Sequence, residues 1–199
     1  MDILQAIGDT SLVRLRKIVP SHCADIFVKL EWENPTGSMK DRMALAVISR
    51  AEADGRLKAG DTVVEYTGGS TGAALAFICA VKGYRLKIVT SDAFSQEKRD
   101  HMAALGAELT LIPSEGGLAT RKLFLDMIET AREMSRQPHT YWINQLENRD
   151  STGVMPGSGC SKLPSSGSIG TCTVNVEPTS GVLSTEMVPF RRSTSWRTM

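Results

Sequence analysis

The sequence predicts an α/β fold in which parallel βα units build one sheet covered by helices. Between residues 62 and 145, short runs rich in β-branched residues alternate with longer amphipathic runs. A helical pattern that begins near residue 40 ends at a turn formed by residues 53–55. Strands separated by helices of this length pair in parallel and are joined by right-handed crossovers.

The predicted elements follow one another regularly after this first helix. Four segments are predicted as strands: TVVEY at 62–66, RLKIVTS at 85–91, AELTLIPS at 107–114 and TYWINQ at 140–145. Three are predicted as helices: 73–84, 95–106 and 118–137. Ligands of parallel sheets bind outside the carboxyl ends of the strands. The loops after Tyr66, Ser91, Ser114 and Gln145 are therefore the expected places for a site.

The composition argues against nucleic-acid and membrane partners. The 199 residues carry 23 basic and 22 acidic side chains, a net charge of +1, and no basic run. No stretch approaches the roughly 20 apolar residues that cross a bilayer, and the first residues lack the pattern of a signal peptide. We expect a soluble, cytoplasmic protein.

The cysteines and histidines are too scattered to predict a metal site. The four cysteines form no C-x-x-C pair, and the three histidines do not lie near them at ligand spacing. Cys79 lies inside the apolar run 73–81. We expect a buried, unreactive thiol there rather than a nucleophile.

The composition changes near residue 150, which predicts two segments, 1–150 and 151–199. The second is dominated by Ser, Gly, Thr and Pro and loses both helical and strand periodicity. We expect it to be a poorly ordered tail with one short strand candidate near 173–176. A parallel sheet that stops near residue 145 would leave an edge for a partner to cover.

Lys40 is the first candidate for chemistry. It follows the turn-prone run NPTG at 34–37 and stands two residues after Ser38, a good N-cap, with Asp41 placed like a capping-box acid. Stability alone would favour a carboxylate rather than a cation at this positive end of a helix. Lys40 is therefore either a catalytic amine or an ordinary solvated lysine.

The glycine-rich turn TGGSTG at 67–72 is the second candidate. A strand, a glycine turn and a helix start follow one another, so several backbone N–H groups can converge on one anion. Hydroxyl groups from Thr67, Ser70 and Thr71 add donors, and the pattern is neither G-x-G-x-x-G nor a Walker loop. The alternative is a tight turn whose glycines only let the helix pack on the strand.

An amine beside an anion-binding loop suits Schiff-base chemistry on a carbonyl compound. The segments NPTGSMKDR at 34–42 and TGGSTG at 67–72 resemble the cysteine synthase (O-acetylserine sulfhydrylase) and cystathionine β-synthase family, pyridoxal-phosphate enzymes of fold type II. Further similar blocks follow in the family's order over residues 3–150: AIGDTSLVRL, KAGDTVVEYTGGSTG, LAFICAVKGY, ALGAELTLIPSEGG and YWINQLEN. The resemblance implies the N-terminal part of that fold, with the second domain incomplete.

The resemblance also implies residue roles. Lys40 would form the Schiff base with pyridoxal 5'-phosphate and then move the proton at the substrate's α-carbon. Ser70 stands where the family commonly has an asparagine that contacts the cofactor. The α-carboxylate of the amino-acid substrate would be held by residues of the loop and of the NQLEN block: Thr67, Gly68, Gly69, Thr71 and Gln145.

The implied reaction is β-elimination on an activated serine-type amino acid followed by β-replacement with a sulfur nucleophile, as in cysteine biosynthesis. The lysine must lose its proton to act as a base, so the site must lower its pKa. The family resemblance implies a homodimer.

The sequence departs from the family pattern at three places. Ser11 replaces a usual proline, and Ser70 replaces the asparagine. The third departure is larger, because no Gly-Thr-Gly-Gly-Thr loop for the cofactor phosphate follows residue 145. We therefore also expect a truncated or aberrant member, in which VEPTSGVLS at 176–184 echoes a block that normally lies farther along. Two alternatives remain: a non-catalytic fragment acting through a partner subunit, and a plain α/β phosphate-binding domain.

Overall fold

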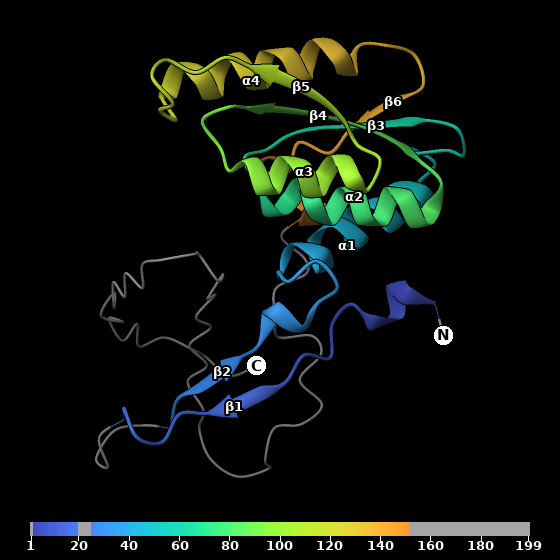
Figure 1. Ribbon diagram of the computed structural model, residues 1–199. Helices are drawn as coiled ribbons and strands as arrows, with labels where there is room; N and C mark the ends of the chain where they lie inside the picture. The colour runs from blue at the N-terminus through green and yellow to red at the C-terminus, as the bar shows by residue number, and fades with distance from the viewer. Residues whose placement is uncertain (1, 20–24, 152–199) are drawn as a thin grey trace, which may run out of the picture.

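The computed structural model of the chain describes residues 2–19 and 25–151, in which a helix-covered parallel sheet carries a small N-terminal hairpin (Figure 1). The predicted tail therefore lies, from residue 152 on, outside the described residues. The same holds for the strand candidate near 173–176 and for the 176–184 block.

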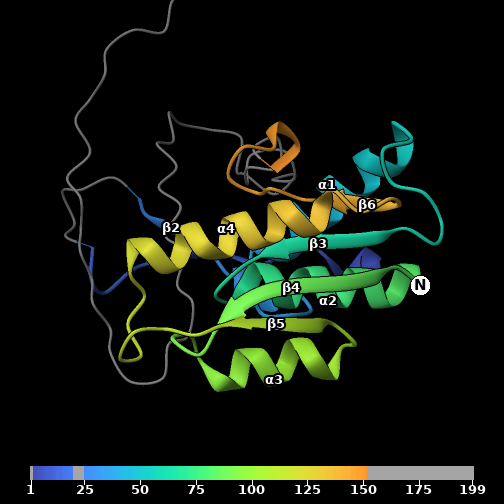
Figure 2. The same cartoon turned by 90° about the horizontal axis from the view of Figure 1, so that it is seen from above.

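The central sheet is parallel throughout, as the sequence predicts. Its strands are β3 (Thr62–Tyr66), β4 (Arg85–Ser91), β5 (Glu108–Ile112) and β6 (Thr140–Trp142). The order across the sheet is β5-β4-β3-β6, which Figure 2 shows with the strands side by side. Within the described residues, the last strand of this sheet, β6, thus pairs with its first strand, β3, at the opposite edge from β5. The segment containing α4 (Arg121–Ser135) therefore crosses the whole sheet.

Helices cover both faces because successive residues of a strand point to opposite sides. Val63 packs into one core together with α1 (Lys40–Ala53), α2 (Ser70–Lys82) and Met102 of α3 (Gln96–Ala104). Val64 packs into a second core against α4. In Figure 1, α4 accordingly lies on one side of the sheet and the other three helices lie on the opposite side.

The element types are confirmed, whereas several boundaries are wrong by a few residues. The helix predicted at 73–84 begins one turn earlier, at Ser70, because the backbone turns helical directly after Gly69. The predicted strand at 140–145 ends at Trp142, so Gln145 lies in a turn beyond the strand. The predictions 95–106, 107–114 and 118–137 are too long at their ends, where residues complete turns and caps instead.

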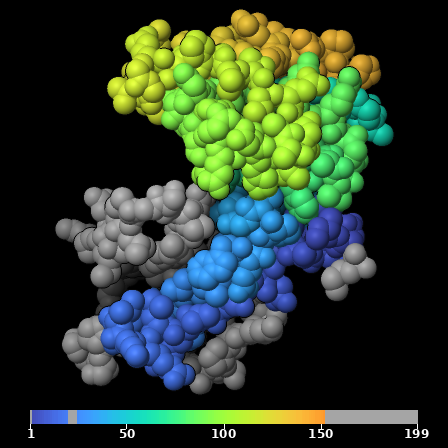
Figure 3. All heavy atoms as spheres, viewed as in Figure 1, coloured from blue at the N-terminus to red at the C-terminus, as the bar shows by residue number. Residues whose placement is uncertain are grey.

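The N-terminal hairpin was not predicted. Its strands β1 (Leu12–Arg14) and β2 (Phe27–Lys29) pair antiparallel, and each is too short to show a convincing alternation of polar and apolar residues. Short 3-10 helices lie before β1 (Ile3–Ala6), after β2 (Glu31–Glu33) and at Arg149–Ser151. Figure 3 shows the hairpin as an arm that projects from the body formed by the sheet and its helices.

Within residues 2–19 and 25–151, no helix has both the length and the apolar content that crossing a bilayer requires.

Candidate active site

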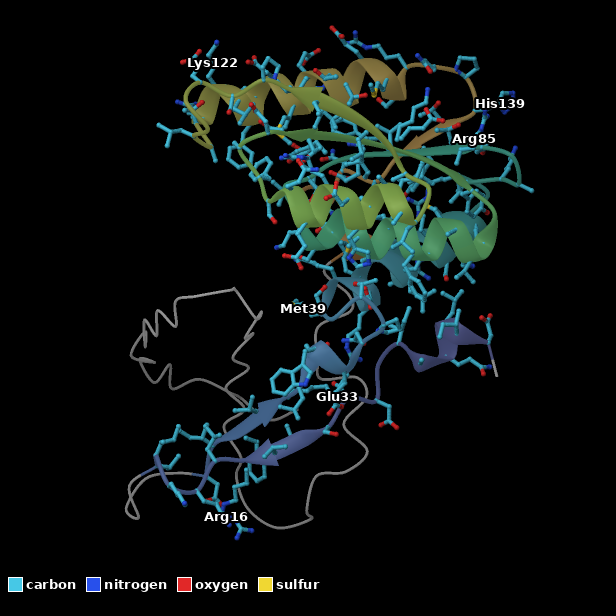
Figure 4. The ribbon with its side chains drawn as sticks, viewed as in Figure 1. Arg16, Glu33, Met39, Arg85, Lys122 and His139 are labelled. Atoms are coloured by element: carbon cyan, nitrogen blue, oxygen red, sulfur yellow. The ribbon has the colours of Figure 1, made fainter. Side chains whose placement is uncertain are left out.

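Lys40 is the first residue of α1, as expected from the sequence, and its side chain is half-buried. The predicted capping differs in detail. Met39 occupies the N-cap position, while the Ser38 hydroxyl accepts the backbone N–H of Lys40 at 3.1 Å. Figure 4 labels Met39 at the point where the chain rises from the hairpin into the helix.

The capping-box role predicted for Asp41 is wrong. Its fully buried carboxylate accepts the backbone N–H of Thr36 at 2.7 Å and also accepts the Thr36 hydroxyl. Burial raises the pKa of Asp41, while these two hydrogen bonds oppose that rise. Asp41 therefore ties the turn before Lys40 to the first turn of α1, rather than closing the helix end on itself.

A second buried network holds the same segment from the other side. Arg42 donates to both carboxylate oxygens of Glu31, from Nε at 2.8 Å and from Nη2 at 3.1 Å. Asn34 Nδ2 donates to Glu31 at 2.8 Å, and the hydroxyl of Thr10 donates to Glu31 at 2.9 Å. Burial opposes ionisation of Glu31, but the hydrogen bonds outweigh it and hold its pKa below the ordinary value.

The network also reaches the N-terminal segment. The backbone N–H of Gly8 donates to the Asn34 side chain at 2.9 Å, and Arg42 Nη2 donates to the Thr10 hydroxyl at 3.0 Å. The segment around Lys40 is therefore fixed by charged hydrogen bonds from the two residues that follow it, Asp41 and Arg42.

The glycine-rich loop connects the carboxyl end of β3 to α2, where a ligand of a parallel sheet is expected. The hydroxyl of Thr67 accepts the backbone N–H of Gly69 at 3.1 Å. Thr67 is buried, whereas Gly68, Gly69 and Ser70 are half-buried. One of the amides predicted to meet an anion is thus bonded within the loop itself.

Packing explains why three positions of this loop are glycine. A Cβ atom at Gly68 would lie 2.6 Å from the Phe94 ring, and one at Gly69 would lie 2.9 Å from the Lys98 side chain. At Gly72, a Cβ would lie 2.2 Å from the sulfur of Met102. Close packing therefore accounts for these three glycines, but the neighbours are Phe94 and two residues of α3, rather than the helix and strand that the alternative named.

Gln145 joins the loop from the opposite end of the described chain. The Thr71 hydroxyl donates to Gln145 Oε1 at 2.7 Å, so two of the predicted substrate contacts are brought together. Asn144 has φ +48°, a left-handed conformation that turns the chain out of the β3–β6 ladder just before Gln145. The side chain of Gln145 thereby reaches the first turn of α2.

Lys40 and the loop lie at the same end of the molecule. Helices α1 and α2 pack against each other in one core, and in Figure 1 they run side by side in the same direction. Their N-termini, which carry Lys40 and Ser70, therefore lie at the end of the sheet where the strands have their carboxyl ends.

Glu65 is the residue of this region that sequence reasoning missed. It is fully buried in β3, and its carboxylate accepts the backbone N–H groups of Tyr66 at 3.1 Å and Gln145 at 3.3 Å. Burial raises the pKa of Glu65 to about 8. An ionisable residue inside TVVEY, a strand covered on both faces, was the available signal.

Cys79 is buried, and burial raises the pKa of its thiol to about 12, which fits the unreactive role predicted. Among the residues that the structure describes, no cluster of His, Cys, Asp and Glu side chains could hold a metal ion.

The described residues fit one side of a pyridoxal phosphate site. Lys40 offers an amine at a fixed helix start, and Ser70 offers a hydroxyl at the start of α2. At Gly68 and Gly69 the place of a side chain is taken by Phe94 and Lys98, so the loop offers its backbone rather than side chains at these two positions. The phosphate loop implied by the family resemblance is not found within 2–19 and 25–151.

Comparison with known proteins identifies the class. Residues 3–158 match the family described as pyridoxal-phosphate dependent enzyme, and the chain belongs to that family. Within it the chain is similar to cysteine synthases. It is 44% identical over 147 residues to the cysteine synthase of Staphylococcus aureus strain Mu50, and 50% identical over 126 residues to cysteine synthase B of Salmonella typhimurium. These matches confirm the resemblance drawn from the sequence.

Solved structures give the same fold. The crystal structure of O-ureido-L-serine synthase matches with a TM-score of 0.64 and 41% identity, covering 75% of this chain and 45% of that one. Cysteine synthase from Entamoeba histolytica matches with a TM-score of 0.66 and 38% identity, covering 74% and 44%. The chain spans about half the length of the curated relatives that it matches, 46% of the Staphylococcus protein and 42% of the Salmonella protein, while 74% and 63% of this chain is covered.

Proposed function

We propose that this chain contributes to pyridoxal-phosphate-dependent β-replacement on an activated serine-type amino acid, the cysteine synthase type of reaction. The observation that carries the proposal is the bonded pair of Thr71 and Gln145, 2.7 Å apart, at the end of the sheet where Lys40 begins α1. The start of α1 thus supplies the amine, while the first turn of α2 and the turn after β6 together supply the polar groups.

The proposed roles divide between the two parts of the site. Lys40 removes and returns the proton at the α-carbon of the substrate. The substrate's α-carboxylate is held near the N-terminus of α2 by N–H and O–H donors of Thr67, Gly68, Gly69, Thr71 and Gln145. Without substrate, the Gly69 N–H donates to Thr67 and the Thr71 hydroxyl donates to Gln145, so these two donors must exchange partners when the carboxylate binds. Ser70 donates to the cofactor. Bound pyridoxal 5'-phosphate would supply the electron sink that makes the α-proton removable.

Orientation is the contribution of the surrounding residues. Asp41 and Arg42, the two residues after Lys40, are bonded to Thr36 and Glu31, which come before it in the chain. A carboxylate fixed at the loop would present the α-carbon to a lysine whose backbone is held by these neighbouring bonds, and such fixed geometry is a large part of enzymatic rate enhancement.

The assembly and location implied by the resemblance belong to the same proposal. We expect a homodimer in the cytoplasm, with an amino acid as the small-molecule substrate. Light scattering of the purified chain and fractionation of cells that express it test these two points.

Trapping the cofactor tests the proposed chemistry. The full chain is mixed with pyridoxal 5'-phosphate, its visible spectrum is recorded, and the sample is reduced with borohydride and mapped by peptide mass. We expect the pyridoxyl mass on the peptide that carries Lys40, its loss in Lys40→Ala, and its retention in Lys58→Ala, which removes an exposed lysine elsewhere.

The outcomes separate this proposal from the fragment alternative. If Lys40→Ala leaves the spectrum and the trapped mass unchanged, the assignment of Lys40 is wrong. If the folded wild-type chain takes up no cofactor, the non-catalytic fragment is the better description, and a partner subunit should then be sought by co-purification.

A further inference from the structure

Glu65 is a buried acidic side chain that the proposed reaction does not use. It lies in β3 with no exposed surface, between Val64 and Tyr66, which pack against α4. A carboxyl group in such a place costs free energy unless it has polar partners. Those partners therefore show what Glu65 does.

Its two carboxylate oxygens take different partners. One oxygen, Oε1, accepts the backbone N–H of the next residue, Tyr66, at 3.1 Å. The other, Oε2, accepts the backbone N–H of Gln145 at 3.3 Å, across 80 positions of sequence. The second bond links β3 to the turn that follows β6.

The bond to Gln145 takes the place of a backbone hydrogen bond of the β3–β6 ladder. The β3–β6 ladder continues as far as the backbone bond from Ile143 to Val64, at 3.0 Å. Asn144 then adopts φ +48° and turns the chain away. The Glu65 side chain supplies the acceptor for Gln145 that the strand backbone no longer offers at this point.

Gln145 is consequently held on three sides. Its N–H donates to Glu65, its carbonyl oxygen accepts the Ser151 hydroxyl at 2.8 Å, and its Oε1 accepts the Thr71 hydroxyl at 2.7 Å. The bond from the Gln145 N–H to Glu65 fixes the position of the Gln145 backbone. Because the side chain extends from that backbone, the same bond controls whether Gln145 Oε1 reaches the Thr71 hydroxyl.

We propose that Glu65 is a positioning residue, whose carboxyl group fixes the backbone of Gln145 and so keeps the Gln145 side chain bonded to Thr71 in the candidate carboxylate site. The inference rests on the proposed function for the purpose of that site, while the contact itself is tested without substrate or cofactor.

Backbone and side-chain amides of Gln145 are followed by NMR in the full chain. Glu65→Gln keeps the size of the side chain but replaces one of the two carboxyl oxygens by an NH2 group, which donates and cannot accept. Glu65→Asp keeps both oxygens but shortens the reach. Asp61→Asn is the matched control, because Asp61 is also buried, lies at the opposite end of β3, and accepts the Lys58 N–H at 2.8 Å.

We expect both Glu65 variants to raise hydrogen exchange at the Gln145 N–H by about tenfold, the effect of losing one hydrogen bond. The resonances of the Gln145 side-chain amide should shift with it. Asp61→Asn should leave both signals in place even where it lowers global stability, so general loosening of the fold cannot produce the expected result.

Two results would overturn the proposal. One is an unchanged Gln145 side-chain amide in the folded Glu65 variants. The other needs no variant: if the Gln145 N–H of the wild-type chain exchanges as fast as an exposed loop amide, Glu65 does not hold it. A chain that fails the borohydride test, yet releases Gln145 in Glu65→Gln, would refute the proposed function and leave the positioning role intact.

Discussion

Thr71 and Gln145 lie 74 positions apart in the sequence, and the hydroxyl of Thr71 donates a hydrogen bond to Gln145 Oε1 at 2.7 Å. The pair joins the first turn of α2 to the turn after β6. Thr71 is buried, so this bond is shielded from competition with water.

Replacing Thr71 by valine should remove this bond without changing the size of the side chain. We expect a loss of about 1–2 kcal/mol in the free energy of unfolding, because the Gln145 oxygen loses its partner. Urea denaturation of the full chain measures the loss. Thr71→Ser keeps the hydroxyl and should retain the Gln145 resonances of the wild type, whereas equal shifts in both variants would show that the methyl group matters more than the bond.

Breaking the Glu31–Arg42 pair should be more damaging. The two side chains are 6% and 15% exposed, so Arg42→Met leaves a buried carboxylate without its cation. We expect a loss of about 3–5 kcal/mol in the free energy of unfolding. Arg132→Met is the control, since its pair with Glu129 is 48% exposed on both sides and should contribute less than about 1 kcal/mol.

A double variant separates the pair from the individual side chains. Combining Arg42→Met with Glu31→Gln should cost less than the sum of the single changes, because no unpaired charge remains. Strict additivity in urea denaturation would mean that the two groups do not stabilise each other.

Glu65 predicts a pH dependence of stability. Burial raises its folded-state pKa from 4.5 to about 8, so folding favours the protonated form. The contribution of Glu65 to stability is therefore fully present below pH 4.5 and is lost as the pH rises through 8. The loss should amount to a few kcal/mol, on the order given by the pKa difference.

Urea denaturation from pH 5 to 9 measures this slope. Glu65→Gln cannot ionise, so its free energy of unfolding should vary less over the range than that of the wild type. Parallel curves for the two proteins would show that Glu65 ionises equally easily in the folded and unfolded chains.

Gly68 tests the close packing of the loop. Gly68→Ala should place a methyl group 2.6 Å from the Phe94 ring, and we expect a cost of about 1–3 kcal/mol from the resulting overlap. Phe94→Leu in the same chain should recover part of this loss, because the smaller side chain leaves room. If the losses in the free energy of unfolding of the two single variants simply add in the double variant, Phe94 is not what excludes the methyl group.

The order of elements could be predicted because the pattern changes sharply along the chain. The run TVVEY and the run RLKIVTS were assigned with their true bounds, since Gly and charged residues flank them. Helix starts were harder: α2 begins at Ser70, three residues before the predicted start, although Thr71 and Gly72 have low helix propensity.

The residues of the candidate site also differ in whether the sequence alone could predict them. Lys40 and the 67–72 loop were visible as local motifs, each in one continuous segment. The bonds from Glu65 to Gln145 and from Arg42 to Glu31 join distant segments, and no local pattern encodes them. Asp41 was assigned to a capping box from spacing alone, but in the folded chain its carboxylate accepts the backbone N–H of Thr36 in the NPTG turn instead.

The sheet order has a consequence for when the site can exist during synthesis. Because β6 pairs with β3, the edge beside Gln145 is completed only by the last strand that the described residues contain. A growing chain can fold β3, β4 and β5 with their helices as soon as these have left the ribosome, but it must wait for residues 140–145 before Thr71 has its partner. Among the described strands, the Thr71–Gln145 bond thus depends on the longest-range strand pairing of this sheet.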